Sequence, residues 1–194
     1  EEGGAGGEAM VKDGLIERFG IREIYGMHNS PGLPVGAFAI RPGPFYAATD
    51  QFEITVTGKG GHAAKPDRTI DPTVVSAHMV LALQTIASRN ADPMKAIVVS
   101  VTSFRTESDA FNVIPETVTL RGTMRTFDAE VREMGEARLK AIATQTAATF
   151  GAVAEVDWRR GYPAMVNAET ETEYAAEVAR KISGSVQTDA AAIM

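Results

Sequence analysis

The alternation of apolar and polar residues is clearest after residue 48. Phe52, Ile54 and Val56 alternate with polar residues, a period of two that indicates a strand with one face in water. The glycine-rich run 58–61 ends this strand. Further strands are predicted wherever β-branched or alternating apolar residues recur, at 97–102, 117–125 and 154–158.

Two helices are predicted between these strands. Asp71 can cap the first, with Pro72 in its opening position, and this helix should reach about residue 88. It is apolar on more than one side, which is typical of a helix that covers a sheet and also a second surface, such as another subunit. Asp128 can cap the second helix, which should end at Gly151. Its apolar stripe is Val131, Leu139, Ile142 and Phe150.

The order of elements from 48 to about 160 is therefore β-α-β-β-α-β. This order predicts an α+β, ferredoxin-like domain with a four-stranded antiparallel sheet and two helices on one face. The connection 103–116 is long for a link between two neighbouring strands. It is therefore a candidate functional loop.

The flanking segments give weaker patterns. A short helix is expected at 8–15, stopped near Gly14, and strands are expected at 21–27 and 35–40. The strand 21–27 would deliver His28 at its C-terminal end, where sites on α/β sheets usually lie. A last helix is expected at 169–182, with Tyr174, Val178 and Ile182 at helical spacing.

Composition narrows the possible functions. A chain of 194 residues with 44% hydrophobic and 23% charged residues fits a globular protein. The net charge of −6, without a long Lys/Arg run, argues against nucleic acid or an anionic membrane as a partner. No apolar run spans a bilayer, and no signal peptide is recognisable. The absence of Cys fits a reducing compartment, so we expect a cytoplasmic protein.

Without Cys, a metal site must use imidazole and carboxylate ligands, which suits Zn, Mn, Co or Ni. Glu1 and Glu2 form an adjacent pair, in which one carboxylate can bind a cation while the other takes a proton from metal-bound water. The structural alternative is a charged pair stabilised at a helix N-terminus. A lone His28 after a strand is likewise more often structural than a ligand. Spacing alone favours the structural interpretation of both.

Several short motifs, in this order along nearly the whole chain, carry a more specific signal. The chain resembles the middle of the aminoacylase/carboxypeptidase superfamily of two-metal hydrolases, closest to the hippurate hydrolase and N-acyl-amino-acid amidohydrolase branch. The matching stretches are Glu-Glu-Gly-Gly at 1–4, Gly-Met-His-Asn at 26–29, Gly-Gly-His-Ala-Ala at 60–64, Phe-Asn-Val-Ile-Pro at 111–115, Arg-Gly-Thr-Met-Arg-Thr-Phe at 121–127 and Arg-Gly-Tyr-Pro at 160–163.

The resemblance implies a role for each matching residue. Glu1 would be the general base, and Glu2 and His28 would each bind one of two divalent metal ions. His62 would reach the active site of a partner subunit and stabilise the oxyanion of the tetrahedral intermediate, and Asn112 would hold the substrate's carboxylate or carbonyl. The structural alternatives are a Gly-Gly turn at His62 and a local Asx turn at Asn112. Arg125 is expected to serve the sheet face or an interior ion pair, and His78 packing or an interface.

The implied reaction is metal-dependent hydrolysis of N-acyl or N-aroyl amino acids, such as hippurate, to a carboxylic acid and a free amino acid. Relatives carry further ligands before the Glu pair and near the C-terminus that this chain lacks. Because catalytic Zn needs about three protein ligands, we predict an incomplete metal site and no activity for this chain alone. The intact protein would be the enzyme.

The implied domains are 1–46, part of the catalytic domain; 47–161, the ferredoxin-like lid and dimerisation domain; and 162–194, a return to the incomplete α/β catalytic domain. The inserted domain should fold and form a homodimer, whereas its flanks should be poorly stable. The alternative function is a non-enzymatic dimerisation or peptide-binding module. A ferredoxin-like RNA binder is disfavoured by the charge and by the lack of exposed strand aromatics.

Overall fold

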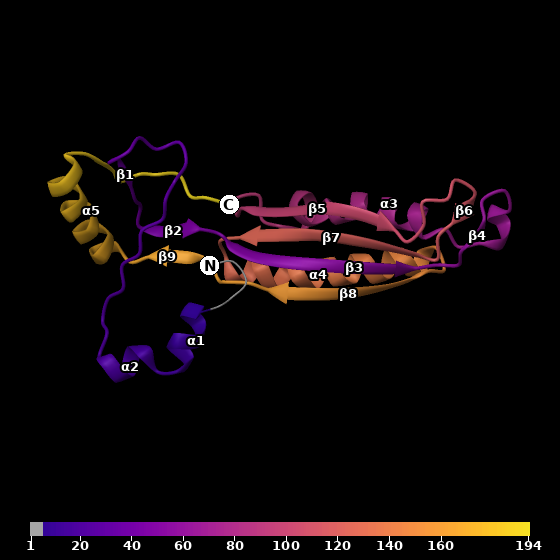
Figure 1. Ribbon diagram of the computed structural model, residues 1–194, viewed down its shortest axis with the longest axis horizontal. Coiled ribbons are helices and arrows are strands. Elements are labelled where there is room, and N and C mark those ends of the chain that lie inside the picture. The colour runs from indigo at the N-terminus through magenta and orange to yellow at the C-terminus, as the bar shows by residue number, and fades with distance from the viewer. Residues whose placement is uncertain (1–5) are drawn as a thin grey trace. The chain divides into compact units, whose positions relative to one another are not determined.

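The computed structural model describes residues 6–194, which form two compact units (Figure 1). Unit 2, the larger, contains Tyr46–Met165 and Ile193–Met194. Unit 1 contains the described residues up to Phe45 together with Val166–Ala192. The following paragraphs take each unit by itself.

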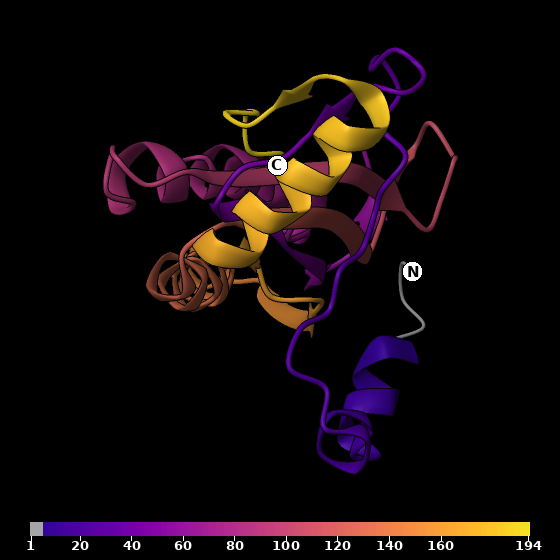
Figure 2. The same cartoon turned by 90° about the vertical axis from the view of Figure 1, so that its left-hand side faces the viewer.

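Unit 2 is built on one four-stranded antiparallel sheet with the strand order β5-β7-β3-β8. Two helices, α3 and α4, cover one face of this sheet (Figure 2). This arrangement confirms the predicted α+β, ferredoxin-like fold. The bounds are β3 Ala48–Thr57, α3 Pro72–Leu83, β5 Ile97–Thr106, β7 Thr117–Thr126, α4 Ala129–Thr149 and β8 Val153–Arg160.

The core of unit 2 lies between the sheet and the two helices. Phe52 stacks on Trp158 of the neighbouring strand, with ring centroids 6.1 Å apart. On the opposite neighbouring strand, β7, the residue paired with Phe52 is Gly122. A Cβ on Gly122 would lie 2.2 Å from the Phe52 ring and 2.2 Å from the carbonyl oxygen of Ser100. Only glycine fits there. Fully buried core residues include Ile54, Val56, Val75, Met79, Leu83, Val118, Leu120, Met124 and Leu139.

Both predicted helix caps are present. Asp71 accepts a hydrogen bond from the Thr73 amide at 2.8 Å, and Asp128 accepts from Glu130 and Val131. The first helix differs from the prediction, because α3 ends at Leu83 and a separate π-helical turn, Ile86–Asn90, follows. Strand β5 is four residues longer than predicted, because β7 offers it partners as far as Thr106, past a bulge between Val101 and Ser103.

Unit 1 departs most from the sequence expectations. The predicted helix 8–15 is two short helices, because Gly14 takes a left-handed φ of 85° between them. The predicted strand 21–27 does not form, since no strand within 6–194 pairs with it, and the strand 35–40 shrinks to two residues. The elements are α1 Gly6–Lys12, α2 Leu15–Phe19, β1 Phe38–Ala39 paired in parallel with β10 Val186–Gln187, and α5 Glu169–Ser183. Strands β2 Gly43–Tyr46 and β9 Met165–Asn167 pair with each other.

Helix α5 forms as expected, but its apolar stripe faces outward. Tyr174 and Ile182 are 58% and 74% exposed, whereas the buried residues of this helix are Thr172 and Ala176. Tyr174 contacts only the ring of Tyr25 among the aromatic side chains of the described chain, with centroids 6.1 Å apart. Among residues 6–194, no helix combines the length and hydropathy needed to cross a bilayer.

Candidate functional site

The candidate site lies where two short strands meet beyond the end of the four-stranded sheet. Strand β4, Gly61–His62, pairs antiparallel with β6, Val113–Ile114, and the two lie side by side at one end of the sheet in Figure 1. The Ala63 amide then donates to the carbonyl oxygen of Asn112 at 2.9 Å. His62 and Asn112, both predicted from the sequence, are thus brought together. We call residues 58–70 and 107–116 the tip.

The base of the tip is held by backbone hydrogen bonds. The Gly58 amide donates to the carbonyl of Glu116 at 2.9 Å, and Lys59 exchanges hydrogen bonds of 2.9 and 3.0 Å with Ile70. A Cβ on Gly58 would lie 2.1 Å from the Ile70 carbonyl oxygen, so this close approach requires glycine. The 3-10 turn Pro66–Arg68 completes the segment. The base of the tip is therefore joined by backbone hydrogen bonds on both of its segments.

Glu107 closes the loop that carries Asn112. Its carboxylate accepts hydrogen bonds from the amides of Glu116 and Thr117 at 2.9 and 3.3 Å and from the Thr117 hydroxyl at 3.0 Å. The amide of Glu116 and the hydroxyl of Thr117 stabilise the charged form, so the pKa of Glu107 is lowered from its usual range. The predicted loop 103–116 is shorter than expected, since β5 continues to Thr106.

His62 is exposed, and its tautomer is set by its own turn. Its Nδ1 accepts a hydrogen bond from the Ala64 amide at 3.1 Å, while its carbonyl accepts from the Lys65 amide at 2.8 Å. Because Nδ1 is an acceptor, the proton of the neutral ring is on Nε2. The ring can therefore donate a hydrogen bond to an oxygen on which negative charge develops.

Asn112 is exposed, and the predicted alternative of an Asx turn is wrong. The bond that fixes this residue uses its backbone carbonyl. Within residues 6–194, no hydrogen bond involves its side-chain amide. The Asn112 side-chain amide therefore remains available to a ligand.

Of the predicted metal-site residues, the described part of the chain contains only His28. Glu1 and Glu2 lie outside the described residues. His28 is exposed in a stretch without regular structure, not at a strand end as predicted, and its Nδ1 lies 2.5 Å from the carbonyl oxygen of Asn29. No group of three or more His, Cys, Asp or Glu residues in the described part of the chain could hold a metal ion. The residues described here thus do not make a metal site.

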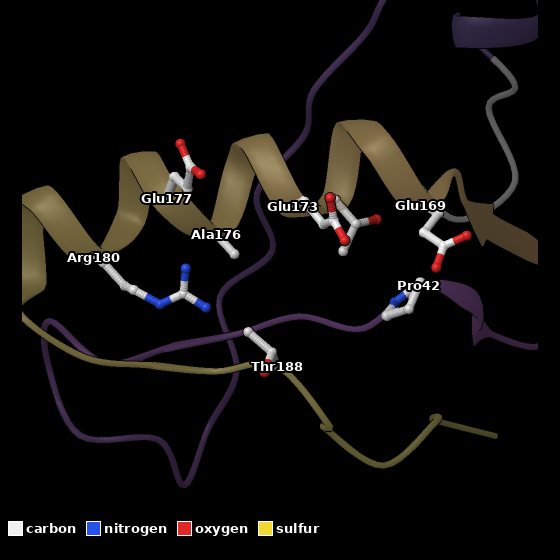
Figure 3. Close-up of a pocket in the computed structure, with 8 residues that line it drawn as sticks. Pro42, Glu169, Glu173, Ala176, Glu177, Arg180 and Thr188 are labelled. Atoms are coloured by element: carbon white, nitrogen blue, oxygen red, sulfur yellow. The ribbon is translucent and has the colours of Figure 1, made fainter.

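A hollow of about 430 Å³ in unit 1 was not predicted (Figure 3). It lies along α5, where Glu169, Glu173 and Glu177 recur at every fourth residue, a spacing visible in the sequence. Arg180 and Glu169 point toward the segments that carry Pro42 and Thr188, whereas Glu177 points away from them. The three carboxylates therefore do not converge, and the hollow carries no site.

Two further expectations concern packing. The ring of His78 packs on Phe150 with centroids 4.8 Å apart, and its Nδ1 lies 3.0 Å from the Val74 carbonyl, as expected for a packing residue. Arg125 donates to the Thr49 hydroxyl at 3.0 Å across the sheet face. Neither residue lies in the tip.

Comparison with known proteins places these features in a family. The sequence profile of the M20 peptidase dimerisation domain matches residues 49–150. The chain is 39% identical to the N-acetyl-L-cysteine deacetylase of Bacillus subtilis, over 93% of this chain and 43% of that protein. It is 33% identical to the hippurate hydrolase of Campylobacter jejuni, over 95% of this chain and 48% of that protein.

A solved structure agrees with these relatives. The Bacillus subtilis YXEP protein, a dinuclear metal-binding peptidase from the M20 family, superposes with a TM-score of 0.72 at 32% identity. The match covers 98% of this chain and 46% of that chain. The chain thus spans about half the length of the curated relatives and of the solved structure that it matches.

Proposed function

Because the chain belongs to the M20 peptidase family, we propose that it forms part of a metal-dependent amidohydrolase. The substrate would be an N-acyl or N-aroyl amino acid, hydrolysed to a carboxylic acid and a free amino acid. Two relatives support this class of substrate, because their names specify N-acetyl-L-cysteine and hippurate. The observation that carries the proposal is the pairing of β4 with β6, which joins the backbone of Asn112 to the segment that carries His62.

In this proposal the two tip residues act on the substrate amide. The Nε2–H of His62 donates to the oxygen that becomes negative in the tetrahedral intermediate, an interaction that strengthens as charge develops. The Asn112 side chain binds the substrate's carboxylate or carbonyl oxygen. Both groups are exposed and held from behind by backbone bonds, so they need little reorganisation during the reaction.

Only some of the residues that would bind the metal ions are proposed within this chain. Bound divalent ions polarise a carbonyl and make water nucleophilic at neutral pH. Glu2 and His28 remain the proposed ligands and Glu1 the proposed base, but two ligands do not complete a catalytic site. We therefore propose that the 194-residue chain is inactive alone and that the remaining ligands come from the rest of the intact enzyme.

The proposed partner is a second copy of the chain, bound along β5. Within residues 6–194 this strand pairs with β7 only, so one edge has no partner there, and Val98 and Phe104 are exposed on the strand. The adjacent helix α3 exposes Val74 and Leu81, the latter 71% exposed. The other edge, β8, carries exposed charges at Glu155, Asp157 and Arg159, which protect an edge strand from pairing. A Leu81→Lys variant should shift sedimentation from dimer to monomer, and an unchanged dimer would contradict this face.

The activity test uses the intact enzyme and a panel of N-acyl amino acids. Release of free amino acid is measured with and without a chelator. His62→Ala should lower kcat by roughly 10²- to 10³-fold, the usual effect of losing one oxyanion donor. Asp67→Ala is the matched control, because Asp67 is exposed in the same tip and makes only a 3.9 Å contact with Arg68.

Two results would overturn the proposal. If the intact enzyme releases nothing from the whole panel with Zn, Mn, Co or Ni present, the reaction is wrong. A stable dimer that binds peptides and ignores the chelator would instead support the non-enzymatic module. If His62→Ala and Asp67→Ala have equal effects, the role of His62 is wrong.

A further inference from the structure

Two large apolar side chains are exposed at the tip, beside the candidate site. Phe111 is completely exposed, at 107% of its reference area, and Val113 is 45% exposed. By contrast, the apolar side chains of the adjoining strand β7 are buried. Exposed apolar side chains next to exposed polar groups are typical of a ligand contact.

The backbone around Phe111 is fixed on both sides. The Val113 amide donates to the Ala110 carbonyl at 3.4 Å, and Asn112 accepts from Ala63 at 2.9 Å. Glu107 also ties the start of this loop to its end. A contact presented on a fixed backbone loses little conformational entropy when a ligand binds.

Register places an apolar group and a proton donor on the same face. His62 and Val113 are direct partners across the β4–β6 pair, so their side chains emerge on the same side, about 5 Å apart. The next pair, Gly61 and Ile114, faces the opposite side, where Ile114 is buried. The exposed face therefore combines the Nε2–H of His62 with apolar surface at a distance comparable to the size of an acyl group.

We propose that Phe111 and Val113 contact the acyl group of the substrate and that Phe111 sets the preference for acyl size. This inference rests on the proposed amidohydrolase activity and adds the residues that select the substrate. When the amide oxygen accepts from His62, the acyl carbons lie over Val113 and Phe111. Long aliphatic and aromatic acyl groups would gain from this contact, whereas an acetyl group is too small to reach Phe111.

The test measures kcat/KM of the intact enzyme on one amino acid carrying acetyl, butanoyl, hexanoyl or benzoyl groups. Phe111→Ala should lower kcat/KM by roughly 10- to 100-fold for the hexanoyl and benzoyl substrates. The acetyl substrate should change by less than about 2-fold, since it makes no contact with the ring. Phe111→Leu should restore most of the loss for hexanoyl. Met94→Ala is the matched control, because Met94 is 89% exposed and lies outside the tip.

Other outcomes overturn the inference. Equal losses on all four acyl groups would mean that Phe111 is structural, and no loss on any would mean that it does not touch the substrate. A change in the sedimentation of Phe111→Ala would assign the residue to a subunit contact. If the wild-type enzyme hydrolyses none of the substrates, the proposed function fails separately. Calorimetry with the benzoyl amino acid then decides the inference: weaker binding by Phe111→Ala supports it, and equal or absent binding overturns it.

Discussion

The two units of the chain differ in how far they bury their apolar residues. Unit 2 buries a continuous core between its sheet and its two helices. Among the described residues of unit 1, only Thr172, Ala176 and Ala190 are buried, while large apolar side chains such as Met27 and Val35 are exposed. Since burial of apolar surface drives folding, the stability of this chain is concentrated in unit 2.

Chain connectivity explains the difference. In unit 2 all four strands and both covering helices come from one continuous segment, Tyr46–Met165. In unit 1 the only partner of β1 in the described chain is β10, whose residue Val186 pairs with Phe38 from far along the sequence. Two residue pairs give little cooperativity. The ferredoxin-like unit is therefore the part of the fold that this sequence specifies fully.

The largest expected effect comes from breaking the buried ion pair of unit 2. Arg132 binds both carboxylate oxygens of Asp50, at 2.8 and 2.6 Å, and also donates to the Gly161 carbonyl. The side chains are 1% exposed for Asp50 and 12% for Arg132. Asp50→Ala should lower the free energy of unfolding by about 3–5 kcal/mol, because it leaves a buried charge unpaired. Urea denaturation followed by the fluorescence of Trp158, the only tryptophan, measures it.

The control for Asp50→Ala is an exposed ion pair in unit 1. Asp13 pairs with Arg18 at 2.7 Å, and both side chains are largely exposed. Asp13→Ala should change the free energy of unfolding, followed by circular dichroism, by less than about 1 kcal/mol. Equal effects of the two substitutions would contradict the contrast between the units.

A smaller effect is expected at the base of the tip. Gly58→Ala places a Cβ 2.1 Å from the Ile70 carbonyl oxygen, and relieving this clash should cost about 1–3 kcal/mol. Gly26→Ala in unit 1 is the matched control, since its Cβ meets no atom within 4 Å, and it should stay within about 0.5 kcal/mol of wild type. Denaturation of both variants in urea measures the difference. An unchanged free energy of unfolding for Gly58→Ala would show that the backbone at the base of the tip shifts to accommodate the Cβ.

The smallest expected effect is a pH dependence of the tip. Hydrogen bonds from Glu116 and Thr117 hold the pKa of Glu107 below its usual range in the folded chain. Its stabilising contribution is therefore complete above the unfolded pKa and is lost as the pH falls through the lower, folded pKa. NMR signals of the Glu116 and Thr117 amides should shift as the pH falls below the usual glutamate range, about 4.3.

The substitution Glu107→Gln should remove that transition. Glu155→Gln, on the exposed edge strand β8, should leave it unchanged. A transition that survives Glu107→Gln would assign the pH dependence to another carboxylate.

Much of unit 2 was predictable because its signals are local. The alternation in β3 and β7, the caps Asp71 and Asp128 and the stop at Gly151 all act within a few residues of the element they define. Unit 1 was predicted less well for the opposite reason. The apolar run 21–27 has the composition of a strand, but a strand exists only when a partner supplies its hydrogen bonds.

In the candidate site, too, some features follow from the local sequence and others only from the fold. His62 and Asn112 were found through short motifs, but the Nε2–H tautomer of His62 depends on the turn at Ala64, which no motif gives. Phe111 was part of a motif, but the motif predicted no role for its side chain. Its exposure is a property of the folded tip. The position of Val113 opposite His62 depends on strand register, which pairs residues 51 positions apart in the sequence.

The sequence by itself determined the ferredoxin-like order of unit 2, because periodicity, caps and turn residues specify each element and its apolar side. Tertiary structure alone decided which side chains share a surface. It placed His62 opposite Val113, turned the apolar stripe of α5 outward and left one edge of β5 without a partner in the described chain. Strand pairing and burial both require a second surface, and the residues of one segment do not specify which surface that is.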